Sequence, residues 1–355
     1  RQKAVYHAYI QQAVNQNLSE KAYLFAQKFL RVFVEREGPE FNLFDMVQKL
    51  NAAMQLKLTY NYTLRTCSLD RYVEIANKGF QCMYHFRTPD QDVLDDMDEL
   101  FEDMVANSGN DGFVAYFKKA HLEGRLTYDE FYHNVIVAVF LSQQTLPHAT
   151  FWPIARCAHD KGVLNAVRNN EDGLVEYVSE EFRVHGPSSP ILMPYISLEE
   201  DAYGSLTVPK GSVIQIMPAL LHTNPRLWEE ANTFKRKRFS SVIGKRLSTL
   251  SIKDIDIDDE EEKKSEDEDL AEKSKSKALT MESMSAMLFS RTDEQDTLDR
   301  PLKKMSRRGS SLEGAPKSAS KQRYMPFGVG RGICPGQKLG LTTVLNSVKA
   351  LIDDW

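Results

Sequence analysis

The stretch FGVGRGICPG, residues 327–336, surrounds one cysteine, Cys334, with four glycines. Apolar residues then recur at helical spacing over residues 339–351, so the sequence predicts a helix that begins just after the cysteine. Glycines carry no Cβ atom and let the backbone approach a flat ligand closely. The first amides and the dipole of a helix favour an anionic sulfur. The stretch therefore predicts a thiolate metal ligand at Cys334, with a structural cysteine beside a turn as the alternative.

The chain before about residue 170 has apolar residues mainly at helical spacing, as over residues 22–33. Breaks such as residues 108–112 divide this half into separate helices. Residues 203–216 show a different pattern, and we expect a small β-hairpin there, with residues 209–211 as its turn. The fold is therefore predicted to be mainly α with a minor β part.

Residues 241–321 differ from the rest of the chain in composition. Between residues 253 and 275 lie 12 acidic residues and 5 lysines, whereas residues 300–323 hold 8 basic residues and one acid. Serine is frequent and aromatic residues are almost absent, so the segment buries too little apolar surface to offset its conformational entropy. We expect one domain, residues 1–240 and 322–355, interrupted by a disordered charged insertion at 241–321.

Bulk properties exclude some classes of protein. The chain has 355 residues, 42% of them hydrophobic, which suffices for one large core. Its net charge of −5 argues against nucleic-acid binding, which needs a concentrated basic face. The four cysteines show no paired spacing and predict reduced thiols. Because the sequence starts at Arg1 and stops at Trp355 within an apolar-periodic stretch, we expect a fragment that is truncated at both ends.

Two further segments offer charged partners for each other. Glu180 and Arg183 are three residues apart, so they share one face of a helix and can form an ion pair. Read alone, this spacing more often marks an exposed pair. Arg238 lies in a second segment, FKRKRF at residues 234–239, which resembles the meander segment of the cytochrome P450 family. The resemblance implies that Arg238 completes a buried cluster with Glu180 and Arg183. Removing one partner would leave an uncompensated charge, so these three residues are predicted to be structural.

A long apolar helix is expected from about residue 131 to 158, with FLSQQTLP, residues 140–147, near its centre. The hydroxyl of Thr145 can bond back to a carbonyl, and Pro147 has no amide hydrogen to donate. Together they predict a local opening of the helix where a small ligand and water fit. The segment resembles the oxygen-binding kink of the cytochrome P450 family, which implies that Thr145 and Gln144 are the catalytic residues. A plain proline kink is the alternative.

In their order along the chain, these motifs resemble those of the cytochrome P450 family. The likeness covers about residues 131–355, the insertion excepted. It implies that the domain binds haem b and that Cys334 is the axial thiolate ligand. Further haem-binding roles fall on Phe327, Gly328, Gly330 and Arg331, and on Arg1 or Lys3 as a basic partner of a haem propionate.

At two positions the sequence departs from the pattern that is common in the family, and both departures point to one branch of it. Gly332 stands where many members have an arginine, and Gln144 stands where an acid usually precedes the threonine. Both departures are similar to the branch of sterol 7α-hydroxylase, sterol 12α-hydroxylase and prostacyclin synthase. A sterol, a fatty acid or another lipid is therefore the expected substrate.

The resemblance implies a haem-thiolate monooxygenase that oxidises an apolar small molecule with dioxygen and electrons from an NADPH-cytochrome reductase. Thr145, with water and Gln144, would steer protons to oxygen. The expected location is the cytosolic face of the endoplasmic reticulum membrane. Two alternatives stay open: an isomerase that rearranges a lipid peroxide or endoperoxide without external electrons, and a haem-free interaction protein on a degenerate fold. The insertion also offers a basophilic kinase a site at Ser310.

Overall fold

The structure is a computed structural model of the chain. It describes residues 2–14, 17–65, 67–84, 87–169, 171–186, 195–239, 324–328 and 333–354. The predicted insertion at 241–321, with the kinase site at Ser310, lies outside these residues. So do Arg1, Gly330, Arg331 and Gly332. The predicted disorder of the insertion therefore stays a prediction.

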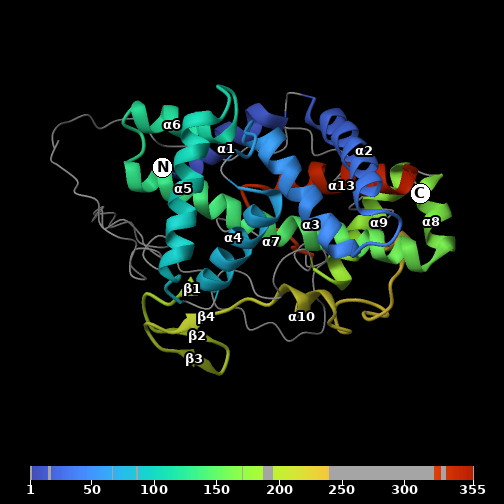
Figure 1. The fold of residues 1–355 in the computed structure, drawn as a ribbon. Helices are drawn as coiled ribbons and strands as arrows, with labels where there is room; N and C mark the ends of the chain where they lie inside the picture. Colours follow the sequence, from blue (N-terminus) through green and yellow to red (C-terminus); the bar gives the residue numbers. More distant parts are fainter. Residues whose placement is uncertain are drawn as a thin grey trace.

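Helices make up most of the described chain (Figure 1), as the sequence predicted. In chain order they are α1 (Gln2–Val14), α2 (Leu18–Glu37), α3 (Leu43–Met54), a π-helix (Gln55–Thr59), α4 (Leu69–Tyr84), α5 (Gln91–Asn107), α6 (Phe113–Leu122), α7 (Tyr128–His159), α8 (Lys161–Arg168), α9 (Glu171–Val184), α10 (Pro218–His222), a 3₁₀ helix (Arg236–Phe239) and α13 (Gln337–Asp354). Within the described part of the chain, no helix is long and apolar enough to cross a lipid bilayer.

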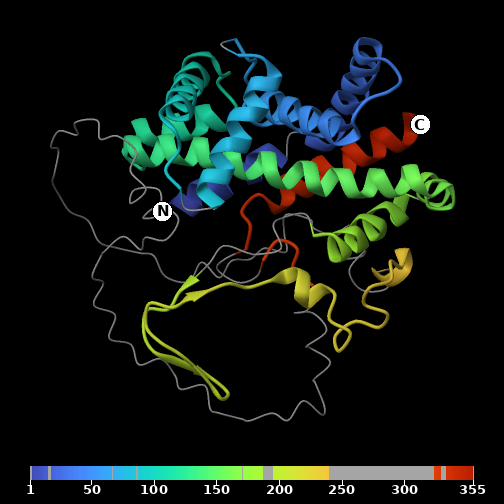
Figure 2. The same cartoon turned by 60° about the horizontal axis from the view of Figure 1, so that its bottom comes forward.

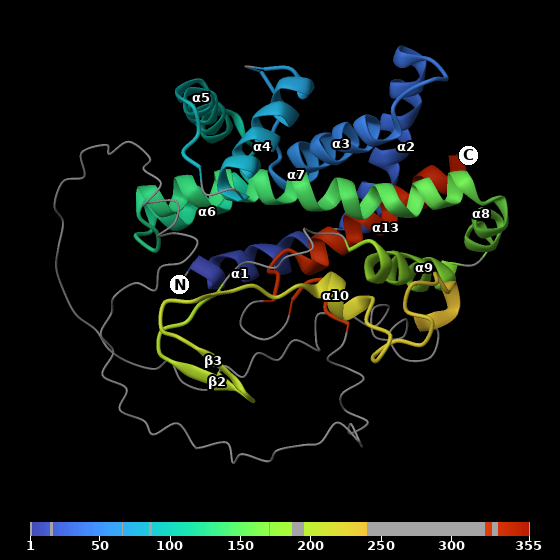
Figure 3. The ribbon, with the colours of Figure 1, turned by 90° about the horizontal axis from the view of Figure 1, so that it is seen from below.

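Helix α7 is the axis of the fold. Figure 3 shows α3, α4 and α5 on one side of it and α13 and α9 on the other. The helix begins at a capping box, in which the Glu130 amide donates to Thr127 Oγ1 and the Thr127 amide donates to the Glu130 carboxylate. Because neighbours cover α7 on most sides, its buried residues lie on several faces of the helix rather than along one stripe.

The buried apolar side chains form two large clusters that both include α7. The first joins α1, α4, α5 and α6 to the first half of α7, where Phe140 is fully buried. The second joins α2, α3, α9 and α13 to its second half. Helices α2 and α13 pack along each other although they stand at opposite ends of the chain, and Ser19 and Asn346, 327 residues apart, exchange hydrogen bonds across this contact.

The β part differs from the predicted hairpin. β2 (Asp201–Tyr203) pairs with β3 (Leu206–Val208), and β1 (Tyr195–Ile196) pairs with β4 (Val213–Ile214), each antiparallel. Figure 2 shows the β2–β3 hairpin apart from the helices. The prediction that residues 209–211 close a hairpin is therefore wrong, because this turn connects one sheet to the other. The tight hairpin turn contains Gly204, whose φ of 65° suits it. Gly211 also has a positive φ, 83°. Both glycines therefore suit a tight turn, and the sequence alone does not show which of them closes the hairpin.

The packing of α4 on α7 can be tested at Gly79. A Cβ atom added there would stand 2.4 Å from Phe140 Cζ. We expect Gly79→Ala to lower the free energy of unfolding by up to about 2 kcal/mol, because overpacking costs ~1–3 kcal/mol and the helix propensity of alanine returns ~1 kcal/mol. Urea unfolding followed by circular dichroism would measure this.

The matched control is Gly340→Ala on α13. Its added Cβ atom would lie 3.3 Å from Leu146 Cδ2, at the tip of a side chain that can rotate. We expect no loss of stability in this variant. Parental stability of the Gly79→Ala variant would show that Gly79 is not closely packed against Phe140.

Candidate functional site

A buried ion cluster joins α9 to the segment that ends in the 3₁₀ helix. Arg183 holds the Glu180 carboxylate with two hydrogen bonds, Nε to Oε2 and Nη2 to Oε1, both 2.9 Å long. Arg238 Nε donates to the same two oxygens at 3.0 and 3.1 Å. The side chains of Glu180 and Arg183 are 0% exposed. The structure thus brings together the three residues that the sequence singled out as a cluster.

The remaining donors of Arg183 are also satisfied. Its Nη1 donates to the carbonyls of His222, at 2.7 Å, and Ala231, at 2.6 Å, and its Nη2 donates to the carbonyl of Thr233 at 3.2 Å. Counted with the two bonds to Glu180, all five guanidinium N–H groups have acceptors. This geometry fixes the segment from α10 to the 3₁₀ helix against α9.

The start of the cysteine loop is anchored on the same elements. Tyr324 Oη donates to the carbonyl of Ser179 at 3.1 Å. The amide of Met325 donates to His222 Nε2 at 3.0 Å. His222 is 1% exposed, and burial, with a smaller effect of Arg183, lowers its pKa to about 4. The ring is therefore neutral near pH 7, and its Nε2 can accept a hydrogen bond.

Cys334 stands between this anchor and α13. Its amide donates to the carbonyl of Phe327 at 2.8 Å, and its own carbonyl accepts from the amide of Gln337, the first residue of α13, at 3.2 Å. Gly328, with φ 76°, allows the loop to turn where another residue would be strained. Cys334 is exposed. The expected helix thus begins just after the cysteine.

Helices α1 and α7 both pack against α13, the helix that follows Cys334. Burial raises the pKa of Tyr6 on α1, and the charge of a thiolate at Cys334 adds to this rise. Tyr6 Oη donates to the carbonyl of Asn134 on α7 at 2.9 Å. Further along α7, Leu146 contacts α13 at Gly340, six residues after Cys334. The neighbour of Thr145 therefore packs against the helix that Cys334 precedes.

The candidate residues of α7 have separate partners. Thr145 Oγ1 donates to the carbonyl of Leu141 at 2.9 Å, which is the expected bond back to the helix. Gln144 Nε2 donates to Asn77 Oδ1 on α4 at 2.8 Å. The helix continues through Pro147, so the predicted opening is limited to the bond that proline cannot donate. Asn77 was missed because no spacing in the sequence links it to Gln144.

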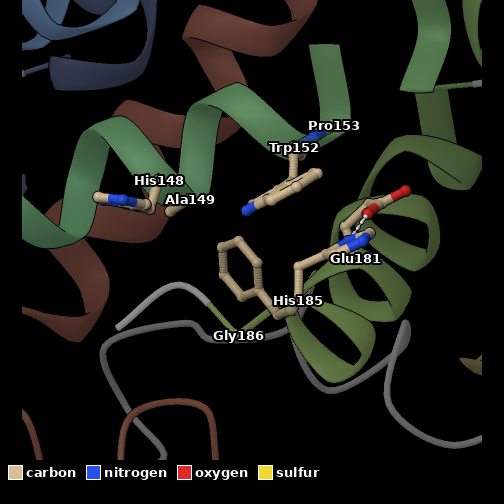
Figure 4. Close-up of a pocket in the computed structure, with 8 residues that line it drawn as sticks. His148, Ala149, Trp152, Pro153, Glu181, His185 and Gly186 are labelled. Atoms are coloured by element: carbon tan, nitrogen blue, oxygen red, sulfur yellow. Dashed lines mark hydrogen bonds and ion pairs between the residues drawn. The ribbon is translucent and has the colours of Figure 1, made fainter. Parts of the chain in front are cut away.

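A second buried carboxylate lies next to the ion cluster. Glu181 forms an ion pair with Arg156 on α7, and its Oε2 lies within hydrogen-bond distance, 2.7 Å, of His185 Nδ1. The His185 ring stacks on Trp152, with 4.1 Å between ring centroids. Figure 4 shows Glu181, His185 and Trp152 around a shallow recess between α7 and α9. Adjacent carboxylates thus serve two clusters, one toward the 3₁₀ helix and one toward α7.

Comparison with known proteins places this arrangement in a family. Residues 29–251, more than half of the chain, match the family model described as Cytochrome P450. The chain belongs to the cytochrome P450 family. Members of this family hold a haem through a cysteine thiolate, so the cofactor of this cytochrome P450 is haem with thiolate ligation.

Its curated relatives match over short stretches. An isoflavone 2'-hydroxylase of Glycyrrhiza echinata and an isoflavone 3'-hydroxylase of Medicago truncatula are 35% and 36% identical over 66 residues. In both cases the match covers 19% of this chain and 13% of the relative. A third relative, cytochrome P450 81F4 of Arabidopsis thaliana, is 25% identical over 141 residues, or 33% of this chain and 28% of the relative.

Solved structures extend the likeness of fold to nearly the whole chain. A zebrafish cytochrome P450 determined with abiraterone has a TM-score of 0.66 at 13% identity, covering 99% of this chain and 72% of that protein. CYP154A1 of Streptomyces coelicolor has a TM-score of 0.59 at 14% identity, covering 94% of this chain and 64% of that protein.

The described residues fit a haem on the side of its thiolate ligand. Cys334 offers an exposed, soft sulfur ligand next to a helix N-terminus, and its backbone is held at both the amide and the carbonyl. Gly336 leaves room, since a Cβ atom there would lie 3.7 Å from the sulfur. Lys3 lies in α1, but the structure does not describe its side chain. Arg1, Gly330 and Arg331 lie outside the described residues, so the haem contacts of all four residues stay predictions.

The ion cluster yields a stability prediction. We expect Arg183→Ala to lower the free energy of unfolding by about 3–5 kcal/mol, because it leaves the carboxylate of Glu180 buried without its bidentate partner. Urea unfolding and the haem content of the purified protein would measure the effect.

Lys78→Ala on α4 is the control, since its ion pair with Glu74 is exposed and such pairs contribute at most about 1 kcal/mol. Near-parental stability of the Arg183 variant would mean that the cluster is not buried as described.

Proposed function

We propose that this chain is the haem-binding part of a monooxygenase, which oxidises an apolar small molecule with dioxygen and electrons from a redox partner. The observation that carries the proposal is the exposed Cys334, held at the N-terminus of α13 beside the threonine-bearing helix α7. When bound, the haem supplies dioxygen binding and activation. The matched relatives that are named as hydroxylases support this class of reaction.

In this proposal Cys334 is the axial ligand, and the chain keeps its sulfur anionic. The first amides of α13 and the dipole of that helix favour the thiolate. The bond between the Cys334 amide and the Phe327 carbonyl fixes where the sulfur projects. Phe327 and Gly328 shape the loop on the other side, and Phe327 packs on Phe182 of α9, with ring centroids 6.0 Å apart. Glu180, Arg183 and Arg238 hold this loop without taking part in the reaction.

Thr145 is the proposed proton-handling group. Its hydroxyl donates to the carbonyl of Leu141, which leaves the Oγ1 lone pairs free to accept from a water molecule. Such a water would be held with its other hydrogen directed away from Thr145 and would serve as a proton donor that exchanges with solvent. Gln144 cannot titrate as a carboxylate does. Its amide is held by Asn77, so we assign to it the orientation of α7 against α4.

We infer a sterol, a fatty acid or another lipid as the substrate class. The support is the pair of departures at Gln144 and Gly332, which resemble the sterol hydroxylase and prostacyclin synthase branch. We propose an NADPH-cytochrome reductase as the electron donor, with Lys235, Arg236 and Lys237 as a basic surface for its docking, at the endoplasmic reticulum membrane. A kinase site at Ser310 stays part of the proposal for the insertion.

An isomerase that needs no external electrons is the second candidate. The amide at Gln144 in place of an acid favours it, because rearrangement of a peroxide does not require proton delivery from a reductive cycle. Consumption of NADPH and oxygen with a panel of lipids separates the two reactions.

The ligand assignment predicts the outcome of Cys334→Ser. The reduced carbon monoxide complex should lose its thiolate-type band, because a serine hydroxyl is harder and far less acidic than a thiol. Cys82→Ser on α4 is the control and should keep the parental spectrum. An unchanged spectrum in the Cys334 variant would assign the ligand elsewhere, and a parent without any such band would end the haem-thiolate proposal.

The role of the hydroxyl predicts the outcome of Thr145→Ala. A monooxygenase should divert more of its electrons to peroxide and form less product per NADPH, while substrate still shifts the spectrum. Thr145→Ser, which keeps the hydroxyl, should retain most of the coupling. Peroxide assay and product yield would be measured together. Equal yield per NADPH in the alanine variant and the parent would remove Thr145 from proton delivery.

A further inference from the structure

We propose that His222 is a positioning residue that transmits the fixed geometry of the Glu180–Arg183–Arg238 cluster to the backbone that carries Cys334. The inference rests on the proposed function and adds a residue that the sequence motifs did not single out. His222 is the last residue of α10, and it stands between the ion cluster and the first turn of the cysteine loop.

His222 is bonded to the ion cluster through its backbone and to the cysteine loop through its side chain. Its carbonyl accepts the 2.7 Å hydrogen bond from Arg183 Nη1, so its backbone is fixed by the cluster. Its ring accepts the 3.0 Å hydrogen bond from the Met325 amide, so its side chain fixes the loop. The ring also lies 5.5 Å, centroid to centroid, from that of Tyr324. One buried residue therefore bonds to both the cluster and the loop.

A short path leads from Met325 to the proposed ligand. The carbonyl of Met325 accepts the amide of Gly328 at 3.1 Å and closes a turn. Within this turn lies Phe327, whose carbonyl accepts the amide of Cys334 at 2.8 Å. A displacement of Met325 therefore moves the carbonyl that holds Cys334, and with it the direction in which the sulfur projects.

The chemistry of the ring supports a role as acceptor. With Nε2 accepting from Met325, the proton of the neutral ring is on Nδ1. Among the described residues this buried Nδ1 has no hydrogen-bond partner. An unpaired buried donor is unfavourable, and an apolar side chain of similar size would avoid it. A role in packing alone would not require a polar side chain here, whereas acceptance of the Met325 amide requires a hydrogen-bond acceptor at the position of Nε2.

Three variants separate this role from simple stabilisation. His222→Leu removes the acceptor, His222→Gln places an amide oxygen near the position of Nε2, and His222→Asn shortens the reach to that of Nδ1. We expect the leucine and asparagine variants to shift part of their bound haem from the thiolate-type to the thiol-type carbon monoxide band, compared at equal haem content. His222→Gln should restore the thiolate-type band.

Hydrogen exchange gives a second readout that does not depend on activity. The Met325 amide should exchange on the order of tenfold faster in the leucine and asparagine variants than in the parent, because it loses one hydrogen bond. His222→Gln should return its exchange toward the parental rate.

His133→Leu on α7 is the matched control. His133 is also buried, with one bonded and one unpartnered ring nitrogen, but its bond is to Asp129 within its own helix. It should lower stability without changing the ligand band.

The outcomes are distinct. Parental ligand bands and Met325 exchange rates in the leucine and asparagine variants would overturn the proposal. If His222→Leu fails to hold haem, the asparagine and glutamine pair carries the test, and equal behaviour of the two would overturn it. If the parent shows no thiolate-type band, the proposed function is wrong. The exchange rate of the Met325 amide in the His222 variants still tests whether that amide is bonded to His222.

Discussion

The carboxylate of Glu180, buried and shared by two arginines, is the interaction on which the rest of the site depends. One anion faces two cations in an interior where unbalanced charge is strongly unfavourable. The surplus positive charge is offset by backbone carbonyls, since Arg183 and Arg238 together bind those of five residues, namely His222, Glu229, Glu230, Ala231 and Thr233. These hydrogen bonds fix the positions of the carbonyls. The segment from His222 to Thr233, which has little regular structure, therefore follows a defined backbone path.

Much of this arrangement was predictable because it depends on local patterns. The spacing of Glu180 and Arg183 predicts their pairing on one helix, and the apolar run around Thr145 predicts the long helix with its internal hydroxyl bond. The loop and helix at Cys334 follow from glycines and apolar periodicity. The cytochrome P450 fold then follows from the order of these motifs, and the family and structure comparisons agree with it.

Other features depend on tertiary contacts that spacing does not reveal. The hairpin was misplaced because Gly204 and Gly211 both have left-handed backbones, and strand pairing alone decides which turn closes a hairpin. His222 carries no signal that separates an acceptor for a distant amide from any other histidine. No spacing in the sequence links Gln144 to Asn77, which its amide contacts between α7 and α4, and its part in proton delivery stays a prediction.

The packing of α2 against α13 has a consequence for biosynthesis. A ribosome releases the chain from its N-terminal end, so α2 emerges long before the helix that covers it. During that interval its apolar face, which includes Ala22, Ala26, Leu30 and Phe33, lacks its final partner. Contacts between such distant segments form late and slow the search for the native state. The nascent chain therefore presents a hydrophobic helix to chaperones until α13 has been synthesised, and premature release would favour aggregation over folding.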